Sequence, residues 1–437
     1  MLNNKKNTFE QHDNESGSYY FHSILKPDLF SHLQENLNAD ICIIGGGLTG
    51  VTSALYLAKN GYKVVLLEAR KVGWGASGRN GGQLSFGLRR EQIYIEKLLG
   101  VNHAKELWNL GLEAVQDVKD YISTYKIDCG IQQGVMQAGY YKKDYVNFHN
   151  EIEHLQKYYD FDNFKYFDEK EIQEQINSKK YYSGLLNKSA YHLNPLKLLY
   201  GLVRELINLK VMIFENSPVE KIEENHGGVN IFTKHNIINA NFAVVGCNGY
   251  LDNLLGKVRN KYMPINNYII ATEPIGEENA RKFIRNNYAV CDTRFIIDYY
   301  RFSEDWRMLF GGGETFTSNF LREAKYFVSK RMYKVFPDLK KYKIDFSWGG
   351  TLAITINRLP NFGTLMNDKV LYAQGYSGHG LALSTLAGKL IAEKISGTSN
   401  RFNFFQSISH FTIPGGNLLR RPIYASAVAY YKFRDLY

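Results

Sequence analysis

The chain has 437 residues, 44% of them hydrophobic, which is enough to bury a large core in one or more domains. Lysine and arginine number 53 against 43 acidic residues, but the basic residues form scattered pairs, which excludes the concentrated basic face typical of nucleic-acid binding. Cysteines 42, 129, 247 and 291 are too widely spaced for a metal site or a disulfide framework. The polar N-terminus and the lack of a long apolar run predict a cytoplasmic protein without a membrane span.

A short apolar run that ends in glycines opens the first recognisable unit. Residues 39–50 read ADICIIGGGLTG, and VTSALYLAKNG follows with apolar residues at helical spacing. The pattern predicts a strand, a tight turn and a helix that stops at Gly61. KVVLLE then predicts a second buried strand that ends in Glu68.

Each glycine of this turn has a mechanical task in a dinucleotide site. Gly45 permits the turn, Gly47 lets the backbone approach a pyrophosphate, and Gly50 lets helix and strand pack closely. The carboxylate of Glu68 is placed to accept hydrogen bonds from ribose hydroxyls and would repel a 2'-phosphate. The pattern predicts FAD or NAD rather than NADP, and does not choose between the first two.

A second glycine-rich stretch follows at once. Residues 73–82 read GWGASGRNGG, which places Trp74, Arg79 and Asn80 among five glycines, a composition unlike that of a flexible linker. We expect the main chain here to run close against the cofactor, with backbone N–H groups and Arg79 as donors toward its negative charge.

Further elements return to the same sheet late in the chain. Two helices are predicted over 90–125 and another over 194–210, capped by Asn194 with Pro195 in its first turn. VLYAQG predicts a buried strand, and GYSGHG at 375–380 opens a helix whose N-terminus could stabilise charge on a reduced flavin. The alternative for that unit is an ordinary strand, loop and helix without a ligand.

Three stretches together, GGGLTG with Glu68, GWGASGRNGGQ and GYSGHG, resemble the D-amino-acid-oxidase-like FAD-dependent oxidoreductases. Within that superfamily the chain is most similar to the gamma-glutamylputrescine oxidoreductases, through SYY near the N-terminus, YYRFSEDWRMLFGGGE, WGGTLAITINRLPNFG, PGGNLLRRP and AYYKFRD. The resemblance implies an α/β fold in which a Rossmann-like FAD-binding domain is interleaved with an α+β substrate domain built on a mainly antiparallel sheet, as in glycine oxidase and sarcosine oxidase. The implied division is an extension at 1–37, an FAD domain at 38–95, 150–255 and 360–437, and substrate-binding and helical parts at 96–149 and 256–359.

The resemblance also implies which residues bind FAD, held without a covalent bond. They fall into five segments: Gly45, Gly46, Gly47, Thr49 and Gly50; Glu68, Ala69 and Arg70; Ala76, Ser77, Gly78, Arg79, Asn80, Gly81, Gly82 and Gln83; Val219 with Cys247, Asn248 and Gly249; and Gly375, Ser377, Gly378, His379 and Gly380.

The implied reaction is oxidation of a primary or secondary amine. Hydride would pass from the amine α-carbon to flavin N5, water would hydrolyse the imine, and O2 would reoxidise the flavin to give H2O2. No catalytic side chain is assigned with certainty: His379 and Arg307 are candidates, and His379 is better explained as a residue that shapes the flavin site. Substrate-binding candidates are Tyr299, Arg301, Trp348, Arg358 and Tyr376, with Arg301 or Arg358 as the partner of a gamma-glutamyl carboxylate.

Two departures from the sarcosine-oxidase-like relatives narrow the expectation. Ala382 stands where those proteins carry a carboxylate-binding lysine, which argues against an α-amino-acid or N-methylglycine substrate. The segment GGTLAITINRLPNFG lacks the cysteine that attaches their flavin, so we expect a dissociable FAD. Two alternatives to an amine oxidase remain: an amino-acid dehydrogenase that passes electrons to a quinone, and a flavoprotein in which FAD is structural. The oligomeric state is left open.

Overall fold

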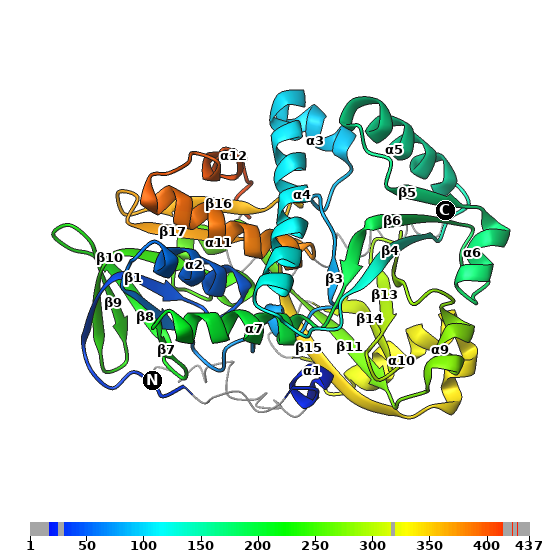
Figure 1. The fold of residues 1–437 in the computed structure, drawn as a ribbon, viewed down its shortest axis with the longest axis horizontal. Helices are drawn as coiled ribbons and strands as arrows, with labels where there is room; N and C mark the ends of the chain where they lie inside the picture. The colour runs from blue at the N-terminus through cyan, green and yellow to red at the C-terminus, as the bar shows by residue number, and fades with distance from the viewer. Residues whose placement is uncertain (1–16, 25–29, 316–319, 414–421, 423–425, 427–437) are drawn as a thin grey trace.

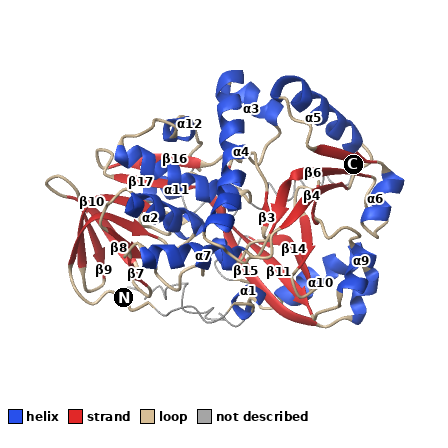
Figure 2. Cartoon of the chain, viewed as in Figure 1, coloured by secondary structure: helices blue, strands red, loops and turns tan. Residues whose placement is uncertain are grey.

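The computed structural model describes residues 17–24, 30–315 and 320–413, together with positions 422 and 426. The first 16 residues of the N-terminal extension lie outside the described part, as does nearly all of the C-terminal motifs PGGNLLRRP and AYYKFRD. Two sheets lie side by side, with one long helix standing between them in this view (Figures 1 and 2).

The first sheet has eight strands and a parallel centre. In spatial order its main path is β16 (Asn361–Leu365), β17 (Val370–Gln374), β10 (Ile237–Val245), β1 (Leu37–Ile44), β2 (Val64–Leu67) and β7 (Met212–Phe214), with β9 (Val229–Thr233) and β8 (Val219–Glu224) attached antiparallel beside β10. The parallel register sets Ile43 beside both Val244 and Leu66. The carboxyl ends of these strands therefore meet at one edge, where ligands bind in open α/β sheets.

Strands β8 and β9 and residues 251–262 pack on one face of this sheet and helices cover the other, because its β-branched strands need apolar cover on both faces. The helices are α2 (Leu48–Lys59), α7 (Pro195–Asn208), α11 (Gly380–Ser396), α4 (Val101–Thr124) and the short α12 (Phe402–Gln406). Helices α2 and α11 touch so closely that a Cβ added to Gly388 would lie 2.0 Å from Thr52 Oγ1. This contact brings together α2 and α11, which are far apart in the sequence.

The second sheet has nine strands and is antiparallel except where β12 pairs with β4. In spatial order it contains β15 (Ile344–Thr355), β11 (Tyr262–Thr272), β14 (Met308–Thr315), β13 (Asp298–Phe302), β12 (Ala289–Asp292), β4 (Gln132–Gly139), β6 (Ser183–His192) and β3 (Gln83–Leu84), with β5 (Phe164–Phe167) beside β6. Its outer face packs an apolar cluster around Tyr300, Phe310 and Phe336.

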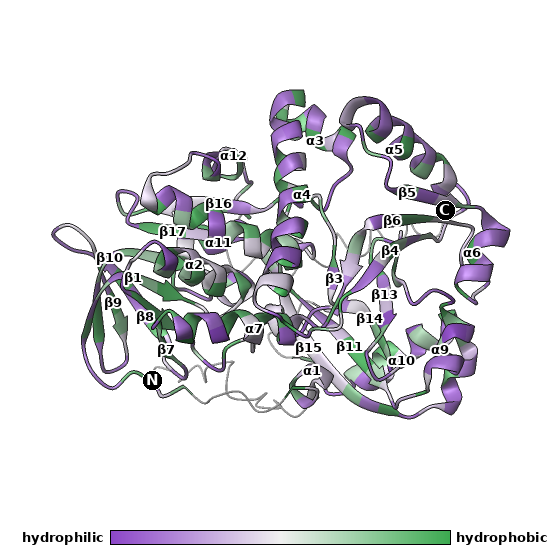
Figure 3. Ribbon diagram, viewed as in Figure 1, coloured by the Kyte–Doolittle hydropathy of each residue, from purple (hydrophilic) through white to green (hydrophobic). Residues whose placement is uncertain are grey.

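The remaining helices lie around the second sheet or join the two halves. They are α1 (Tyr19–His22), α3 (Gln92–Leu99), α5 (Asp144–Tyr159), α6 (Glu169–Gln175), α8 (Gly256–Arg259), α9 (Glu277–Phe283) and α10 (Ala324–Val335), with 3-10 turns η2 (Ala76–Gly78), η3 (Asn248–Tyr250) and η4 (Pro337–Lys341). Figure 3 shows hydrophilic outer turns on α6 and α9 and hydrophobic strands beneath the helices. None of the helices in the described part combines the length and the apolar character needed to cross a bilayer.

The predicted fold class is confirmed, and most predicted elements form where the patterns place them. Gly61 follows the end of α2 with φ +86°, and the side chain of Asn194 accepts from the N–H groups of Leu196 and Lys197 to cap α7. The predicted boundaries differ in two places. Strand β3 falls within 38–95, which we assigned to the cofactor domain, yet it pairs with β6 of the second sheet. Strands β5 and β6 fall within 150–255, which we assigned to the cofactor domain, yet they belong to the second sheet because β6 pairs with β4.

Candidate active site

A cavity of about 1610 Å³ lies between the two sheets. Ordinary small-molecule pockets enclose roughly 300–1,000 Å³, so this one has room for a large dinucleotide and a substrate together. It begins near Val219 and Asn253, passes the edge where β1, β2, β10 and β17 end, and reaches the face of the second sheet.

The turn between β1 and α2 forms the first wall of the cavity. Gly45 has φ +110°, and a Cβ added to Gly50 would lie 2.0 Å from the Gly45 carbonyl oxygen. Gly47 precedes helix α2 as a cap without a side chain, and Ser77 Oγ accepts from the N–H of Leu48. The other N–H groups of the first turn and the positive end of the helix dipole remain available to a ligand. These features fit a bound pyrophosphate.

The carboxylate of Glu68 is fixed by two backbone donors. Its Oε2 accepts from the N–H of Gly46 at 2.7 Å, and its Oε1 accepts from the N–H of Arg70 at 2.8 Å. Burial raises the pKa of Glu68, and these two hydrogen bonds oppose that rise. Because each carboxylate oxygen can accept more than one hydrogen bond, Glu68 keeps acceptor capacity toward the cavity that it lines, which fits the ribose hydroxyls of an adenosine.

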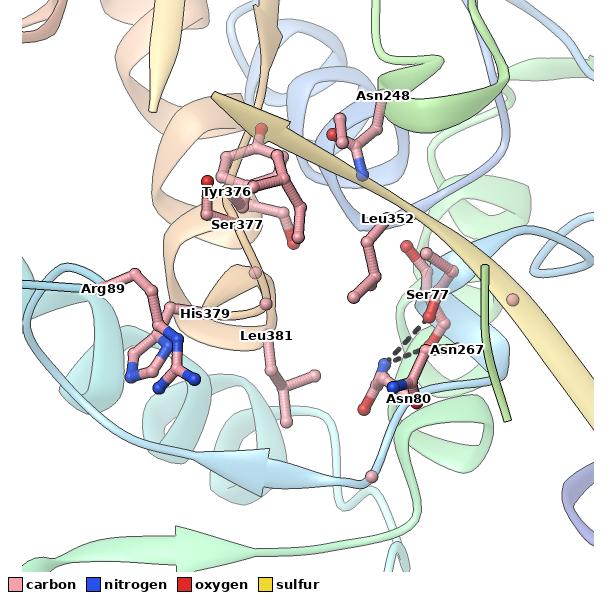
Figure 4. A pocket seen from close by; sticks show the side chains of 18 of the residues that line it. Ser77, Asn80, Arg89, Asn248, Asn267, Leu352, Tyr376, Ser377, His379 and Leu381 are labelled. Atoms are coloured by element: carbon pink, nitrogen blue, oxygen red, sulfur yellow. Dashed lines mark hydrogen bonds between the residues drawn. The ribbon is translucent and has the colours of Figure 1, made fainter. Parts of the chain in front are cut away.

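The second glycine stretch folds against the first. Ser77 Oγ accepts from the N–H of Leu48 at 2.9 Å, so η2 rests on the first turn of α2. Asn80 holds the next turn, since its amide donates to the Ala76 and Ser77 carbonyls and accepts from the N–H of Gly82 (Figure 4). The stretch is therefore a rigid wall of the cavity.

Arg79 joins this wall to the second sheet. Its guanidinium donates to the Trp74 carbonyl at 2.5 Å and to the Gly349 carbonyl at 3.2 Å, while Trp348 Nε1 donates to the Arg79 carbonyl at 3.0 Å. Arg79 lines the cavity, as predicted for a cofactor contact, but part of its donor capacity goes to these two backbone carbonyls.

Trp74 is a cavity residue that the sequence analysis did not assign to the site. Its ring lies 4.4 Å from the Arg70 guanidinium carbon and 4.7 Å from that of Arg79. Its indole Nε1 is buried and has no hydrogen-bond partner in the structure. A buried donor without a partner at a cavity wall fits an anionic ligand, and the only sequence signal was its place between the glycines.

The turn before α11 forms the wall opposite η2. Tyr376 Oη and Thr49 Oγ1 lie 2.7 Å apart, which ties this turn to α2, and Asn248 Oδ1 accepts from the N–H of Gly375 at 3.0 Å. Ser377 and Gly378 have φ of +52° and +92°. The fifth predicted cofactor segment therefore meets the first, and the fourth meets the fifth, as one long ligand requires.

His379 lies beside Arg89 at this end of the cavity (Figure 4). Burial and the positive charge of Arg89 lower the pKa of His379 to about 3. Its Nδ1 is buried and without a partner. A neutral imidazole with so low a pKa is a weak base, which favours a role in shaping the ligand site over proton abstraction.

Most predicted cofactor residues line the cavity. They are Gly45, Gly47, Thr49, Glu68, Ala69, Arg70, Ala76, Ser77, Arg79, Asn80, Gly81, Gln83, Val219, Cys247, Asn248, Ser377, Gly378, His379 and Gly380. The other six are glycines outside its lining that bend or pack the backbone behind it: Gly46, Gly50, Gly78, Gly82, Gly249 and Gly375. For example, a Cβ at Gly78 would lie 2.2 Å from the Gly73 carbonyl oxygen.

Three predicted substrate or catalytic residues lie elsewhere. Arg301 is buried and donates to the carbonyls of Gly81, Leu193 and Phe302 and to the Tyr20 hydroxyl, so it joins segments instead of facing the cavity. Trp348 is buried against Tyr20 at a ring separation of 5.5 Å. Arg307 pairs with Asp305 and Asp345 away from the cavity lining. Isolated arginines and aromatics carry no sequence signal that separates these roles.

Tyr299, Arg358 and Tyr376 do line the cavity. The second sheet adds residues that the sequence analysis missed: Asn267 and Ile269 from β11, Cys291 from β12, Glu314 from β14 and Leu352 from β15. Arg89 and Leu381 face the same space (Figure 4). They come from separate strands and loops, so no spacing in the sequence groups them.

The fold and the cavity together fit the dinucleotide-binding class of α/β proteins, with the second sheet lining the cavity across from the glycine turn. Comparison with known families gives the class: residues 40–394 match the DAO family, described as FAD dependent oxidoreductase, so the chain belongs to that family. FAD is its cofactor, and the residues above fit it.

Individual relatives agree with this assignment. The chain is 36% identical over 421 residues to the gamma-glutamylputrescine oxidoreductase of Escherichia coli (strain K12), covering 96% of this chain and 98% of the relative. The crystal structure of glycine oxidase from Geobacillus kaustophilus superposes with a TM-score of 0.72 at 17% identity, over 86% of this chain and 100% of that one. L-proline dehydrogenase from P. horikoshii superposes with a TM-score of 0.69 at 22% identity, over 84% of this chain and 95% of that one.

Proposed function

We propose that this FAD-dependent oxidoreductase oxidises the terminal primary amine of gamma-glutamylputrescine or a close analogue, with O2 as the electron acceptor. The observation that carries the proposal is the 36% identity to a gamma-glutamylputrescine oxidoreductase over nearly the whole of both chains. The size of the cavity supports it, because space beyond the cofactor segments extends over the second sheet to Gln137 and Asn187.

The chain's own task in such a reaction is to bind and orient the amine. Bound FAD supplies the acceptor for the hydride that leaves the amine carbon. Ile269, Leu352 and Leu381 give the cavity an apolar wall near the flavin end. An apolar wall disfavours an ammonium ion and so favours the neutral amine, whose lone pair assists loss of hydride.

Two cysteines of the cavity bear on how FAD is held. Burial raises the pKa of Cys247 to about 12 and that of Cys291 to about 11, so both are thiols at neutral pH. A thiol is a much weaker nucleophile than a thiolate, which supports a dissociable FAD. Flavin should therefore remain in the supernatant after acid precipitation of the protein.

An anaerobic bleaching screen tests the substrate. The holoenzyme is mixed with gamma-glutamylputrescine, putrescine, sarcosine, glycine or D-alanine, and flavin absorbance is followed. We expect rapid bleaching by gamma-glutamylputrescine and slower bleaching by putrescine. Faster bleaching by any of the three amino acids would contradict the proposed substrate.

Release of H2O2 in air tests the acceptor. With O2 as acceptor, peroxide should form in equal amount to the amine oxidised. If the flavin bleaches fast, no peroxide forms, and a soluble quinone restores the flavin absorbance, the enzyme is instead a dehydrogenase.

A further inference from the structure

A partly buried carboxylate lines the cavity from the second sheet. Glu314 stands near the end of β14 and pairs across the ladder with Asn267 of β11. Directly opposed residues in an antiparallel pair project from the same face of the sheet. Asn267 points into the cavity (Figure 4), and Glu314 lines it as well.

In the described part of the chain the side chain of Glu314 has no hydrogen bond or ion pair, which sets it apart from Asp292 and Asp298 of the same sheet. Asp292 and Asp298 both receive Arg294, and Arg331 also donates to Asp298. The nearby Tyr299 hydroxyl donates to Asn267 Oδ1 at 2.5 Å, so its single proton is already used. Enclosing a carboxylate without a donor costs free energy, which a cationic ligand would recover.

Positive charge faces the same space. Burial raises the pKa of Glu314, and the positive charges of Arg358, Arg89 and Arg331 oppose that rise. Arg89 and Arg358 line the cavity with Glu314, and Arg331 donates to Asp298. The Arg358 guanidinium lies 5.0 Å from the ring of Phe295. One anionic and two cationic side chains therefore line the same cavity.

We propose that Glu314, Arg89 and Arg358 form a subsite for the zwitterionic head of an α-amino acid, with Glu314 binding its ammonium and the arginines its carboxylate. The inference rests on the proposed function and specifies its substrate class: an elongated amine whose reacting end is separated from an α-amino-acid head. Such a head has one negative and one positive group on the same carbon, and the three side chains offer the complementary pattern.

Two ligands test the α-amino-acid head and the reacting amine separately. Gamma-glutamyl-n-butylamide carries the head without the terminal amine, and glutarylputrescine carries the terminal amine and a carboxylate without the α-ammonium. Calorimetric binding of the first should weaken at least about tenfold in Glu314→Gln holoenzyme, since a charged hydrogen bond is lost. KM for gamma-glutamylputrescine should rise similarly with kcat little changed, and KM for glutarylputrescine should stay the same.

Three controls make the outcome decisive. Glu314→Asp keeps the charge and should recover part of the affinity, and the exposed Glu323→Gln should match wild type in all assays. Flavin content and the thermal midpoint of Glu314→Gln establish that the variant is folded. Equal binding of gamma-glutamyl-n-butylamide by wild type and Glu314→Gln, or no binding by wild type, would overturn the subsite. Failure of wild type to oxidise gamma-glutamylputrescine would instead overturn the proposed function. The binding of gamma-glutamyl-n-butylamide to wild type and Glu314→Gln would still test whether Glu314 binds the head.

Discussion

The two sides of the cavity present different kinds of atoms to a ligand. On the side of the parallel sheet the contacts are mainly backbone, with the turn at Gly45 to Gly50 folded against η2. On the side of the antiparallel sheet they are side chains, such as Asn267, Glu314 and Leu352 from three separate strands. Cofactor binding should therefore be most sensitive where a Cβ is added, and substrate binding most sensitive where a functional group is removed.

The largest effect is expected from Gly50→Ala. The new Cβ would lie 2.0 Å from the Gly45 carbonyl oxygen, so the turn must shift. Overpacking of this kind costs about 3 kcal/mol at its upper range, which corresponds to ~100-fold weaker FAD binding if the strain falls on the bound turn. The flavin-to-protein absorbance ratio after desalting measures it. Gly256→Ala, whose Cβ meets nothing within 4 Å, is the matched control, and equal flavin retention by the two variants would break the comparison.

Arg301→Met tests the junction between the two sides of the cavity, where β13 meets the glycine stretch. Arg301 donates to the Gly81 carbonyl at 2.9 Å and to the Leu193 carbonyl at 2.8 Å, and its loss leaves buried acceptors without donors. We expect a loss of about 2–4 kcal/mol in the free energy of unfolding, measured with urea. KM for the amine should change little. A large rise in KM with stability unchanged, relative to the exposed control Arg322→Met, would return Arg301 to a substrate-binding role.

The smallest effect is expected at Glu151 of α5. Burial and the charge of Glu91 raise the pKa of Glu151 from its ordinary 4.5 to about 7. The folded state therefore holds this proton more tightly than the unfolded state, and the stability it contributes below pH 4.5 is lost as pH rises through 7. Glu151→Gln should match wild type near pH 4 and be more stable at pH 8 by about 2 kcal/mol, which is below the ~3 kcal/mol of the full shift because the side chain is partly exposed.

Thermal midpoints of both proteins between pH 4 and 8 test this. A difference that does not change with pH would contradict the raised pKa. A difference that grows with pH would show that Glu151, a carboxylate of the cavity lining, lowers the free energy of unfolding at neutral pH. The backbone groups at the glycine turns do not titrate and should have no such effect.

Local patterns were sufficient to predict most of the cofactor side. The glycines at 45–50 and 73–82 and the turn at 375–380 are read from short segments, because a backbone that must approach a ligand closely excludes side chains locally. Trp74 was missed within such a segment, since its indole Nε1 is seen to lack a partner only when the surrounding walls are in place.

The substrate side could be predicted only in outline. Arg301 and Trp348 appeared suitable for a pocket, yet the sheet register buries both behind the glycine stretch. Strands β5 and β6 were assigned to the wrong half because a strand's sheet is decided by its partners, not by its own residues.

The sequence alone determined the class of this protein and the kind of ligand it holds. A main chain that fits a dinucleotide needs glycines at fixed spacing, an acid such as Glu68 and apolar strands. Each of these features is local, so short segments of the sequence are enough to recognise them. Only the tertiary structure decided which polar groups of the second sheet line the cavity. Asn267, Glu314 and Arg89 are far apart in sequence and meet because strand pairing and the packing of two sheets bring them to one cavity.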